Sequence, residues 1–391
     1  MLKKIFHSIV IAVVIVHISI CSEFFGGTNI WAYLTYLCVL FFVILGAQYI
    51  SPLRKFNGLE KLSIFYFIFL FFLTILYGNI STTLIPLIGR SIEIACLLMI
   101  VKMHKDDLTF ILLTGTIVFS ICVYGNFVAL LLNPFGMISS DGEVYYLLGT
   151  NYNQIGPKVM MAFLFSILLS SRYKIVIINT ILVAVIGMIS LLIVQSMTST
   201  VCIAILLFVY LNLWSKTLNK LMFRGLLTAV ALFQILIVFF GNTLNTAESN
   251  AFLDLIGKDA TFTGRTELWG YSAGYFWNSP IWGHGYIDTT DYAESGYFYG
   301  IAKNSHNYIY NLLHKGGVIL LFIITWMIKI SYSRIKPRIN ESNAYIIIMT
   351  GAIFLTMCLF EVYETIYTYL LLIFMYYYNE FIPRQSQYIK A

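Results

Sequence analysis

The sequence predicts an all-α, polytopic integral membrane protein with about 12 transmembrane helices and one large extracytoplasmic loop. Two features of the composition predict this class: 59% of the residues are hydrophobic and only 11% are charged, against about 25% charged residues in soluble domains. The third observation is that apolar runs of about 20 residues recur along the chain. Such runs are typical of membrane helices, because hydrocarbon offers the backbone no hydrogen-bonding partner.

The predicted spans follow these apolar runs in order. They are residues 5–22, 30–50, 62–78, 80–101, 108–132, 158–171, 175–194, 199–213, 225–241, 306–328, 344–360 and 364–381. We divide the chain into an N-terminal bundle of about nine helices (1–241), an extracytoplasmic loop with an interfacial helix (242–305) and C-terminal transmembrane helices (306–391).

Basic residues fall on alternate connections between the spans. The two termini and five of the connections hold 18 of the 24 Lys and Arg residues. The positive-inside rule places these segments, and therefore both termini, in the cytoplasm. Connections 133–157 and 242–305 then face the exterior, and the net charge of +6 does not indicate a nucleic-acid partner.

The cysteines and the N-terminus exclude two other interpretations. All six cysteines lie within or at the ends of apolar runs, so no disulfide framework is expected. Residues 3–21 resemble a signal peptide, but no small-residue cleavage site follows, and we interpret them as an uncleaved first span. No nucleotide-binding, metalloprotease or hydrolase motif appears, and no metal site is expected.

The long loop contains one predicted helix, at residues 266–277. Leu268, Trp269, Tyr275 and Phe276 are spaced to form one face of it. This face is either an aromatic anchor at the level of the lipid headgroups or a platform on which sugars stack, and both remain open.

His306 is the predicted general base. It lies where the loop enters the tenth span, and Ser305 is a plausible N-cap for that helix. In the first helical turn the positive end of the macrodipole would keep the imidazole neutral and able to accept a proton. An ordinary capping or interfacial histidine is the alternative.

Arg265 and Arg90 are the predicted pyrophosphate ligands, because guanidinium groups match phosphate geometry. Arg90 lies in the middle of the fourth span, where a charge costs on the order of 3 kcal/mol. The alternative for Arg90 is a buried ion pair with Glu93, three residues further on. Lys303 is a weaker phosphate candidate.

Four further residues are weaker candidates for contacting the substrate. His284 lies in a Gly-flanked turn, His314 lies two turns beyond His306, and Asn153 belongs to a polar external loop. Asn307 follows the predicted base directly. Each residue type is equally common in structural roles. The sequence therefore leaves open whether these residues contact the substrate or only stabilise the fold.

The stretches GRTELW, NSPIWGHGY and SHNYIYNLLHKGG resemble the shared region of the O-antigen polymerase (Wzy) and O-antigen ligase (WaaL) superfamily of bacterial membrane glycosyltransferases. The resemblance covers about 55 residues and rests on Arg265, the turn from Pro280 to Gly285, and the pair His306 and Asn307. His306 and Gly316 also keep the spacing found in the ligases.

The resemblance implies a GT-C-like membrane fold, an undecaprenyl-pyrophosphate-linked oligosaccharide as donor, no cofactor and no metal. In such a mechanism His306 deprotonates an acceptor sugar hydroxyl, and Arg265 and Arg90 stabilise the departing pyrophosphate, with inversion at the anomeric carbon. A chain-length regulator is a possible protein partner, and membrane lipids surround the chain.

Three functions follow from these expectations. The first is a repeat-unit polymerase for O-antigen or capsule, which acts at the outer face of the bacterial cytoplasmic membrane. The second is a ligase that moves the finished glycan to lipid A core. The third is a flippase for lipid-linked sugars, which would have no need of the large external loop.

Overall fold

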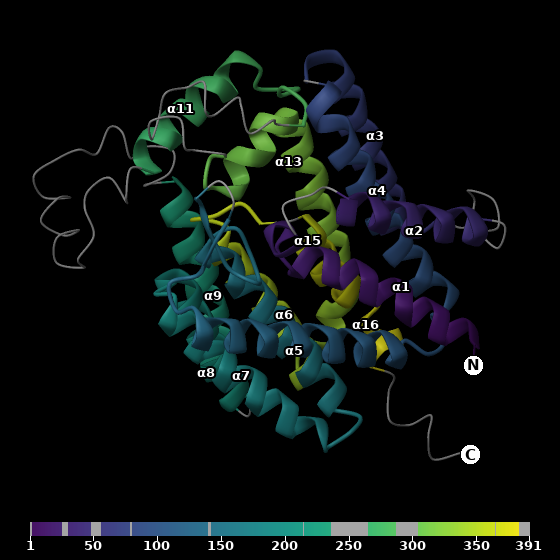
Figure 1. Ribbon diagram of the computed structural model, residues 1–391, viewed down its shortest axis with the longest axis vertical. Helices are drawn as coiled ribbons and strands as arrows, with labels where there is room; N and C mark the ends of the chain where they lie inside the picture. The colour runs from purple at the N-terminus through teal and green to yellow at the C-terminus, as the bar shows by residue number, and fades with distance from the viewer. Residues whose placement is uncertain are drawn as a thin grey trace, which may run out of the picture.

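The computed structural model describes residues 2–25, 30–47, 56–78, 80–139, 142–213, 215–235, 265–286, 304–363 and 365–382 (Figure 1). Its helices are α1 (Leu2–Ser19), α2 (Ile30–Ala47), α3 (Gly58–Tyr77), α4 (Ile80–Met103), α5 (Thr109–Leu132), α6 (Ile155–Ser170), α7 (Val176–Ile193), α8 (Met197–Leu211), α9 (Lys216–Phe233), α11 (Arg265–Asn278), α13 (Tyr308–Ile335), α14 (Ser342–Met357), α15 (Thr365–Tyr376) and α16 (Tyr378–Phe381). The 3-10 turns are η1 (Ser22–Phe25), η3 (Tyr152–Gln154) and η7 (Lys336–Arg338), and β1 (Met137–Ile138) pairs antiparallel with β2 (Val144–Tyr145).

The architecture is all-α, as predicted, and a helix occupies each of the predicted spans within the described residues. Among the described residues, five helices are long and apolar enough to cross a membrane: α3, α4, α5, α7 and α13. Helices α8, α14 and α15 are apolar but shorter. The apolar helices indicate a multi-pass membrane protein, whereas the number of spans and the GT-C-like arrangement stay predictions.

Helix α6 forms the centre of the bundle. All its residues from Ile155 to Leu169 are buried, and it contacts α5, α7, α8 and α14. Large apolar side chains remain exposed along one face of α3, at Phe65, Ile68 and Phe72, and at Ile178 and Ile181 of α7. Such outer faces are suited to lipid hydrocarbon.

Helix α13 differs from the prediction of one continuous span at 306–328. It begins at Tyr308 and is broken at Gly316 and Gly317, whose backbone angles are not helical. The first two turns of α13 pack beside α11, and the chain then bends into the long second part (Figure 1). The physical reason is a tertiary contact with residues 280–285, described below.

Contacts between the helix ends fall into two groups. On the predicted inner side they join Lys4 with Asp107, Glu60 with Lys102, and Arg172 with Phe381. On the predicted outer side they join Cys21 with Leu147, Thr74 with Tyr286, and His306 with Glu361. These contacts are compatible with the alternation of loops predicted from charge, and the topology stays a prediction.

The predicted domain boundaries at 241 and 305 lie close to segments outside the described residues, namely 236–264 and 287–303. They stay predictions. Within the described part, α11 lies against α13 at one end of the molecule (Figure 1), so the external loop and the C-terminal helices share a contact.

Candidate active site

His306 lies in the short segment before α13, two residues ahead of the first helical residue. Its φ is +46°, and Gln195 is the only other non-glycine residue with a positive φ in the described part of the chain. The His306 N–H donates to Asn304 Oδ1 at 2.8 Å, which holds this left-handed turn. Such a conformation costs on the order of 1–3 kcal/mol and is concentrated at functional sites.

The N-cap of α13 is Asn307, so the prediction that Ser305 caps the helix and that His306 occupies its first turn is wrong. Asn307 Oδ1 accepts the Tyr310 N–H at 3.0 Å. The Ser305 hydroxyl donates instead to the Asn307 carbonyl at 2.8 Å. The left-handed turn at His306 delays the start of the helix, because a positive φ cannot continue an α-helix.

The Asn307 side chain also ties the His306 segment to two other elements. Its Nδ2 donates to Gln234 Oε1 at 3.0 Å and to the Leu359 carbonyl at 3.1 Å. With the cap bond, both the donor and acceptor ends of this buried amide are occupied. Asn307 therefore positions the loop, and its predicted contact with substrate would require giving up one of these bonds.

Glu361 is the carboxylate that faces His306. It lies in the connection between α14 and α15, and its Oε1 is 3.1 Å from His306 Nδ1. The contact carries opposite charges only when the imidazole is protonated. The Nδ1 atom is buried, although 27% of the His306 side chain is exposed. The exposed part of the ring therefore lies away from Nδ1.

Glu361 is itself held by neighbours from other segments. Asn153 Nδ2 donates to Glu361 Oε2 at 3.2 Å, and the Val362 N–H donates to Oε1 at 3.2 Å. The Ser196 hydroxyl in turn donates to Asn153 Oδ1 at 3.3 Å. Ser196 follows Gln195, so both non-glycine residues with a positive φ flank this cluster.

The environment of Glu361 favours its ionised form. Burial raises the pKa of this carboxyl, but the hydrogen bond and charge of His306, the Val362 N–H and the charge of Arg265 together outweigh that effect. The pKa of Glu361 consequently lies below its ordinary value of 4.5. A charged carboxylate beside Nδ1 fixes the ring orientation and stabilises an imidazolium when one forms.

Arg265 is the first residue of α11. Its charge lowers the pKa of Glu361 and also opposes the rise that burial causes in the pKa of Tyr363. It makes no hydrogen bond or ion pair with the described residues. Asn153 and His306 both contact Glu361, and Arg265 acts on the same carboxylate through its charge. Within the described residues no hydrogen bond or ion pair occupies the Arg265 guanidinium, a group suited to an anion.

Residues 280–285 interlock with the break in α13. The His284 N–H donates to the His314 carbonyl at 2.8 Å, and the Val318 N–H donates to the Pro280 carbonyl at 2.9 Å. A Cβ on Gly283, whose φ is +69°, would lie 2.5 Å from the Gly316 nitrogen, and one on Gly317 would meet the Ile281 carbonyl at 2.3 Å. Because these glycines lack a Cβ, the backbone of residues 280–285 can touch the backbone at the break in α13. This close approach explains why glycines occupy the turn and positions 316 and 317.

His284 and His314 lie together at this interlock. Their rings are 5.3 Å apart, and both contact the ring of Tyr275 on α11. His314 is fully buried, and His284 Nε2 lies 3.0 Å from the Tyr275 carbonyl. No described contact joins either residue to His306.

Trp269 packs between helices. Its ring is 1% exposed and lies with Tyr310 and Leu313 of α13 and with Phe233 at the end of α9. The predicted helix at 266–277 is confirmed as α11, but the sugar-stacking role proposed for Trp269 has no exposed face in the structure.

Arg90 lies in a separate cluster. Its guanidinium is 2.6 Å from Glu93, whose other oxygen is 2.5 Å from His17 Nδ1 on α1. This is the ion pair that the sequence analysis kept as the alternative. Lys303, the remaining predicted phosphate ligand, lies outside the described residues.

The family model Wzy_C, described as O-antigen ligase, matches residues 181–325. The matched segment is similar to the O-antigen ligase domain. That domain is shared by O-antigen polymerases and O-antigen ligases, which are membrane glycosyltransferases acting on lipid-linked glycans. No protein of curated function matches the chain closely enough to be named as a relative.

The segment matched by the family model contains Arg265 and His306, whereas Asn153 and Glu361 lie outside residues 181–325. Sequence reasoning missed Glu361, having assigned it to a tight external hairpin. One signal was present: Glu361 is a carboxylate in a short connection between two apolar runs, on the same predicted side as His306. Its partner could not be known without the tertiary fold.

Proposed function

We propose that this protein is a repeat-unit polymerase that transfers a glycan from a polyprenyl-pyrophosphate carrier to a sugar hydroxyl on the extracytoplasmic face of the membrane. The observation that carries the proposal is the His306 and Glu361 pair, with Arg265 beside it, at the loop-to-helix junction of the segment similar to the O-antigen ligase domain. A base, its orienting carboxylate and an anion ligand are the parts that glycosyl transfer to a hydroxyl requires.

In the proposed reaction the acceptor hydroxyl gives its proton to Nε2 of His306, while its oxygen forms the new bond to the anomeric carbon. The bond from that carbon to the pyrophosphate oxygen breaks, and its electron pair stays with the pyrophosphate. Glu361 holds Nδ1 and stabilises the imidazolium. One direct displacement inverts the anomeric centre and needs no metal.

Arg265 is the proposed ligand of the departing pyrophosphate, because a guanidinium forms paired hydrogen bonds with phosphate oxygens. Lys303 and Arg90 stay proposed additional ligands. Arg90 would have to leave Glu93 to serve in that way. Asn153 acts in this scheme through Glu361, so it is a positioning residue.

The membrane topology of the proposal has both termini in the cytoplasm and the His306 cluster outside. The grouping of helix-end contacts supports it, since Asn153, Ser196, His306 and Glu361 all belong to connections predicted on the outer side. A chain-length regulator is the proposed protein partner.

The test is to incubate purified full-length protein with a defined undecaprenyl-pyrophosphate oligosaccharide and resolve the products by gel and mass spectrometry. We expect a ladder of repeat units on the carrier lipid and none with His306→Ala, while the control His104→Gln retains the ladder. Transport of the lipid-linked sugar in proteoliposomes without glycosidic bond formation would overturn the proposal.

A ligase is the second candidate, because the matched family is described as O-antigen ligase. The same base and leaving-group chemistry would then act on a lipid A core acceptor. Supplying both acceptors in one reaction separates the two functions. Product on the core alone favours the ligase, and elongated carrier-linked glycan favours the polymerase.

A further inference from the structure

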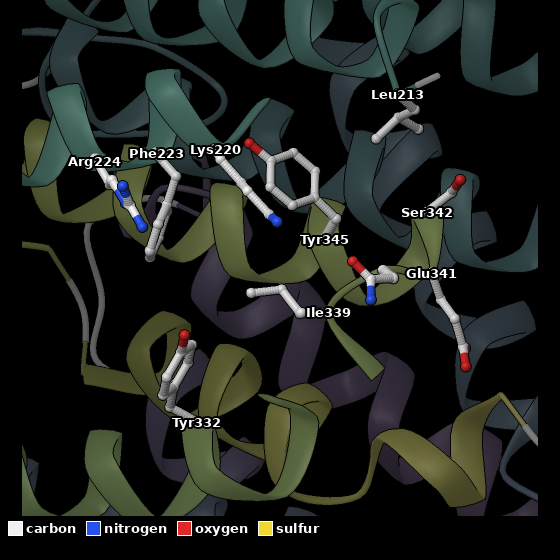
Figure 2. A pocket seen from close by; sticks show the side chains of 10 residues that line it. Leu213, Lys220, Phe223, Arg224, Tyr332, Ile339, Glu341, Ser342 and Tyr345 are labelled. Atoms are coloured by element: carbon white, nitrogen blue, oxygen red, sulfur yellow. The ribbon is translucent and has the colours of Figure 1, made fainter. Parts of the chain in front are cut away.

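A basic pocket lies at the opposite end of the bundle from His306, between α9, the end of α13 and the start of α14 (Figure 2). We call it the α9–α14 pocket; its volume is about 220 Å³, and its lining includes Lys220, Phe223, Arg224, Tyr332, Asn340 and Tyr345. The segments that form it belong to the predicted cytoplasmic connections. It belongs to no part of the site described above.

The charges of the α9–α14 pocket are predominantly positive. Lys220 and Arg224 are four residues apart on α9 and so lie on one face of it. Neither makes an ion pair or hydrogen bond within the part of the chain that the structure describes. Glu341, the acidic residue of the lining, is engaged by Arg338 and by the Tyr378 hydroxyl, and its carboxylate points away from the two cations (Figure 2).

An apolar groove adjoins the pocket. It has a volume of about 460 Å³, runs between α9, α13, α14 and α15, and shares Phe223 and Tyr332 with the α9–α14 pocket. Its other end reaches Tyr308, and its walls are almost entirely apolar, with Leu227, Ile324 and Leu355 among them. A cationic pocket and an apolar groove large enough for part of a hydrocarbon chain therefore adjoin one another and share two lining side chains.

We propose that the α9–α14 pocket binds the phosphate head group of an anionic phospholipid, with one acyl chain lying in the adjoining groove. Two uncompensated cations match the phosphate, and the continuous apolar wall explains why a lipid rather than a free phosphate occupies the site. The inner leaflet is the side of the membrane where juxtamembrane basic residues meet anionic lipids. The proposal is independent of the polymerase chemistry at His306.

The first experiment is native mass spectrometry of the full-length protein titrated with phosphatidylglycerol or phosphatidylcholine of identical chains. We expect phosphatidylglycerol to bind at least about tenfold more tightly, and the preference to fall within about twofold in Lys220→Gln/Arg224→Gln. The control Lys105→Gln/Lys174→Gln removes two exposed loop lysines elsewhere and should keep the preference. A double variant in the α9–α14 pocket that retains the full preference would overturn the proposal.

The second experiment tests the groove. A Cβ on Gly351, which lines the groove, would meet no atom within 4 Å, so Gly351→Phe can fill it without a backbone clash. We expect this variant to weaken phosphatidylglycerol binding while Gly351→Ala does not, and we expect glycerol phosphate to compete poorly. Unchanged lipid binding in Gly351→Phe, together with full displacement by glycerol phosphate, would show a free-phosphate site instead and reject the lipid.

Discussion

Two clusters in the described part of the molecule combine a histidine, a glutamate and an arginine. They differ in how exposed these side chains are and in which of them have ion-pair partners. At His306 the imidazole is 27% exposed, the carboxylate is buried behind it, and Arg265 makes no ion pair with the described residues. In the cluster of His17, Glu93 and Arg90, the imidazole and the guanidinium both contact the same fully buried carboxylate, and neither side chain is more than 12% exposed.

The difference teaches that residue type alone does not mark a catalytic site. In the Arg90 cluster the opposite charges satisfy one another inside the bundle, as buried ionic groups must. In the His306 cluster the Glu361 carboxylate has hydrogen-bond partners. The exposed edge of the His306 ring and the Arg265 guanidinium have no hydrogen-bond partner among the described residues. We therefore expect the first cluster to control stability and the second to control turnover.

The largest expected effect is on activity. His306→Ala should lower the rate of glycan transfer by about 10²- to 10⁴-fold, the usual contribution of a general base. The midpoint of thermal unfolding in the same detergent should fall by less than in a variant of the Arg90 cluster, since part of the His306 side chain is exposed. Retained transfer together with a lowered midpoint would reverse the roles we assign to the two clusters.

The next effect is on stability. Arg90→Met should cost on the order of 3–5 kcal/mol, because it leaves Glu93 buried with one cation fewer. Arg90→Met combined with Glu93→Met should recover most of that loss, as measured by unfolding midpoints of both variants. If Arg90→Met instead raises KM for the lipid-linked donor and leaves the midpoint unchanged, Arg90 contacts the pyrophosphate.

Glu361→Gln keeps the size of the side chain but removes its charge, and it should lower the transfer rate on the order of 10- to 100-fold, as is typical of groups that orient another residue. The matched control Glu143→Gln makes the same change on an exposed outer loop and should have no effect. Equal rates in both variants would remove Glu361 from the mechanism.

The same Glu361 variant has a defined pH dependence of stability. Because the pKa of Glu361 is lowered from 4.5, its contribution is fully present above that value and is lost as the pH falls through the lowered pKa. The difference in unfolding free energy between the original protein and Glu361→Gln should therefore be constant near neutrality and shrink below pH 4.5. A difference that grows on acidification would contradict the assignment.

The smallest effect belongs to an exposed pair that serves as the baseline for both clusters. Lys4 lies 2.6 Å from Asp107, and both side chains are more than 40% exposed. Lys4→Gln should cost no more than about 1 kcal/mol, and the cost should fall further in high salt. The hydrogen bond from Lys4 lowers the pKa of Asp107 to about 2, so the contribution should vanish as the pH falls from 3.8 toward 2.

The helices were predictable from the sequence because membrane helices depend on local apolar runs. The predicted span 108–132 and the observed α5 at Thr109–Leu132 illustrate this agreement. The break in α13 was not predictable, since it depends on backbone contacts between Gly317 and residues 280–281 that are distant in sequence. Pairs of glycines in an apolar run permit a break but do not require one.

Part of the candidate site was also predictable. His306 and Arg265 were found because they sit in motifs of the shared family region, and the structure brings them to one cluster. Glu361 was missed, and Trp269 was expected on an exposed or interfacial face, because burial and pairing across helices arise only from tertiary packing. Local pattern therefore indicated the proposed base and the proposed anion ligand but not the carboxylate that contacts the proposed base.

The cluster of Asn153, Arg265, His306 and Glu361 also has a consequence for biogenesis. These residues lie far apart in the sequence, and Glu361 leaves the ribosome after the other three. A nascent chain that still lacks the final hairpin carries His306 without its carboxylate. A chain released from the translocon at that stage is therefore expected to be inactive in the proposed glycan transfer.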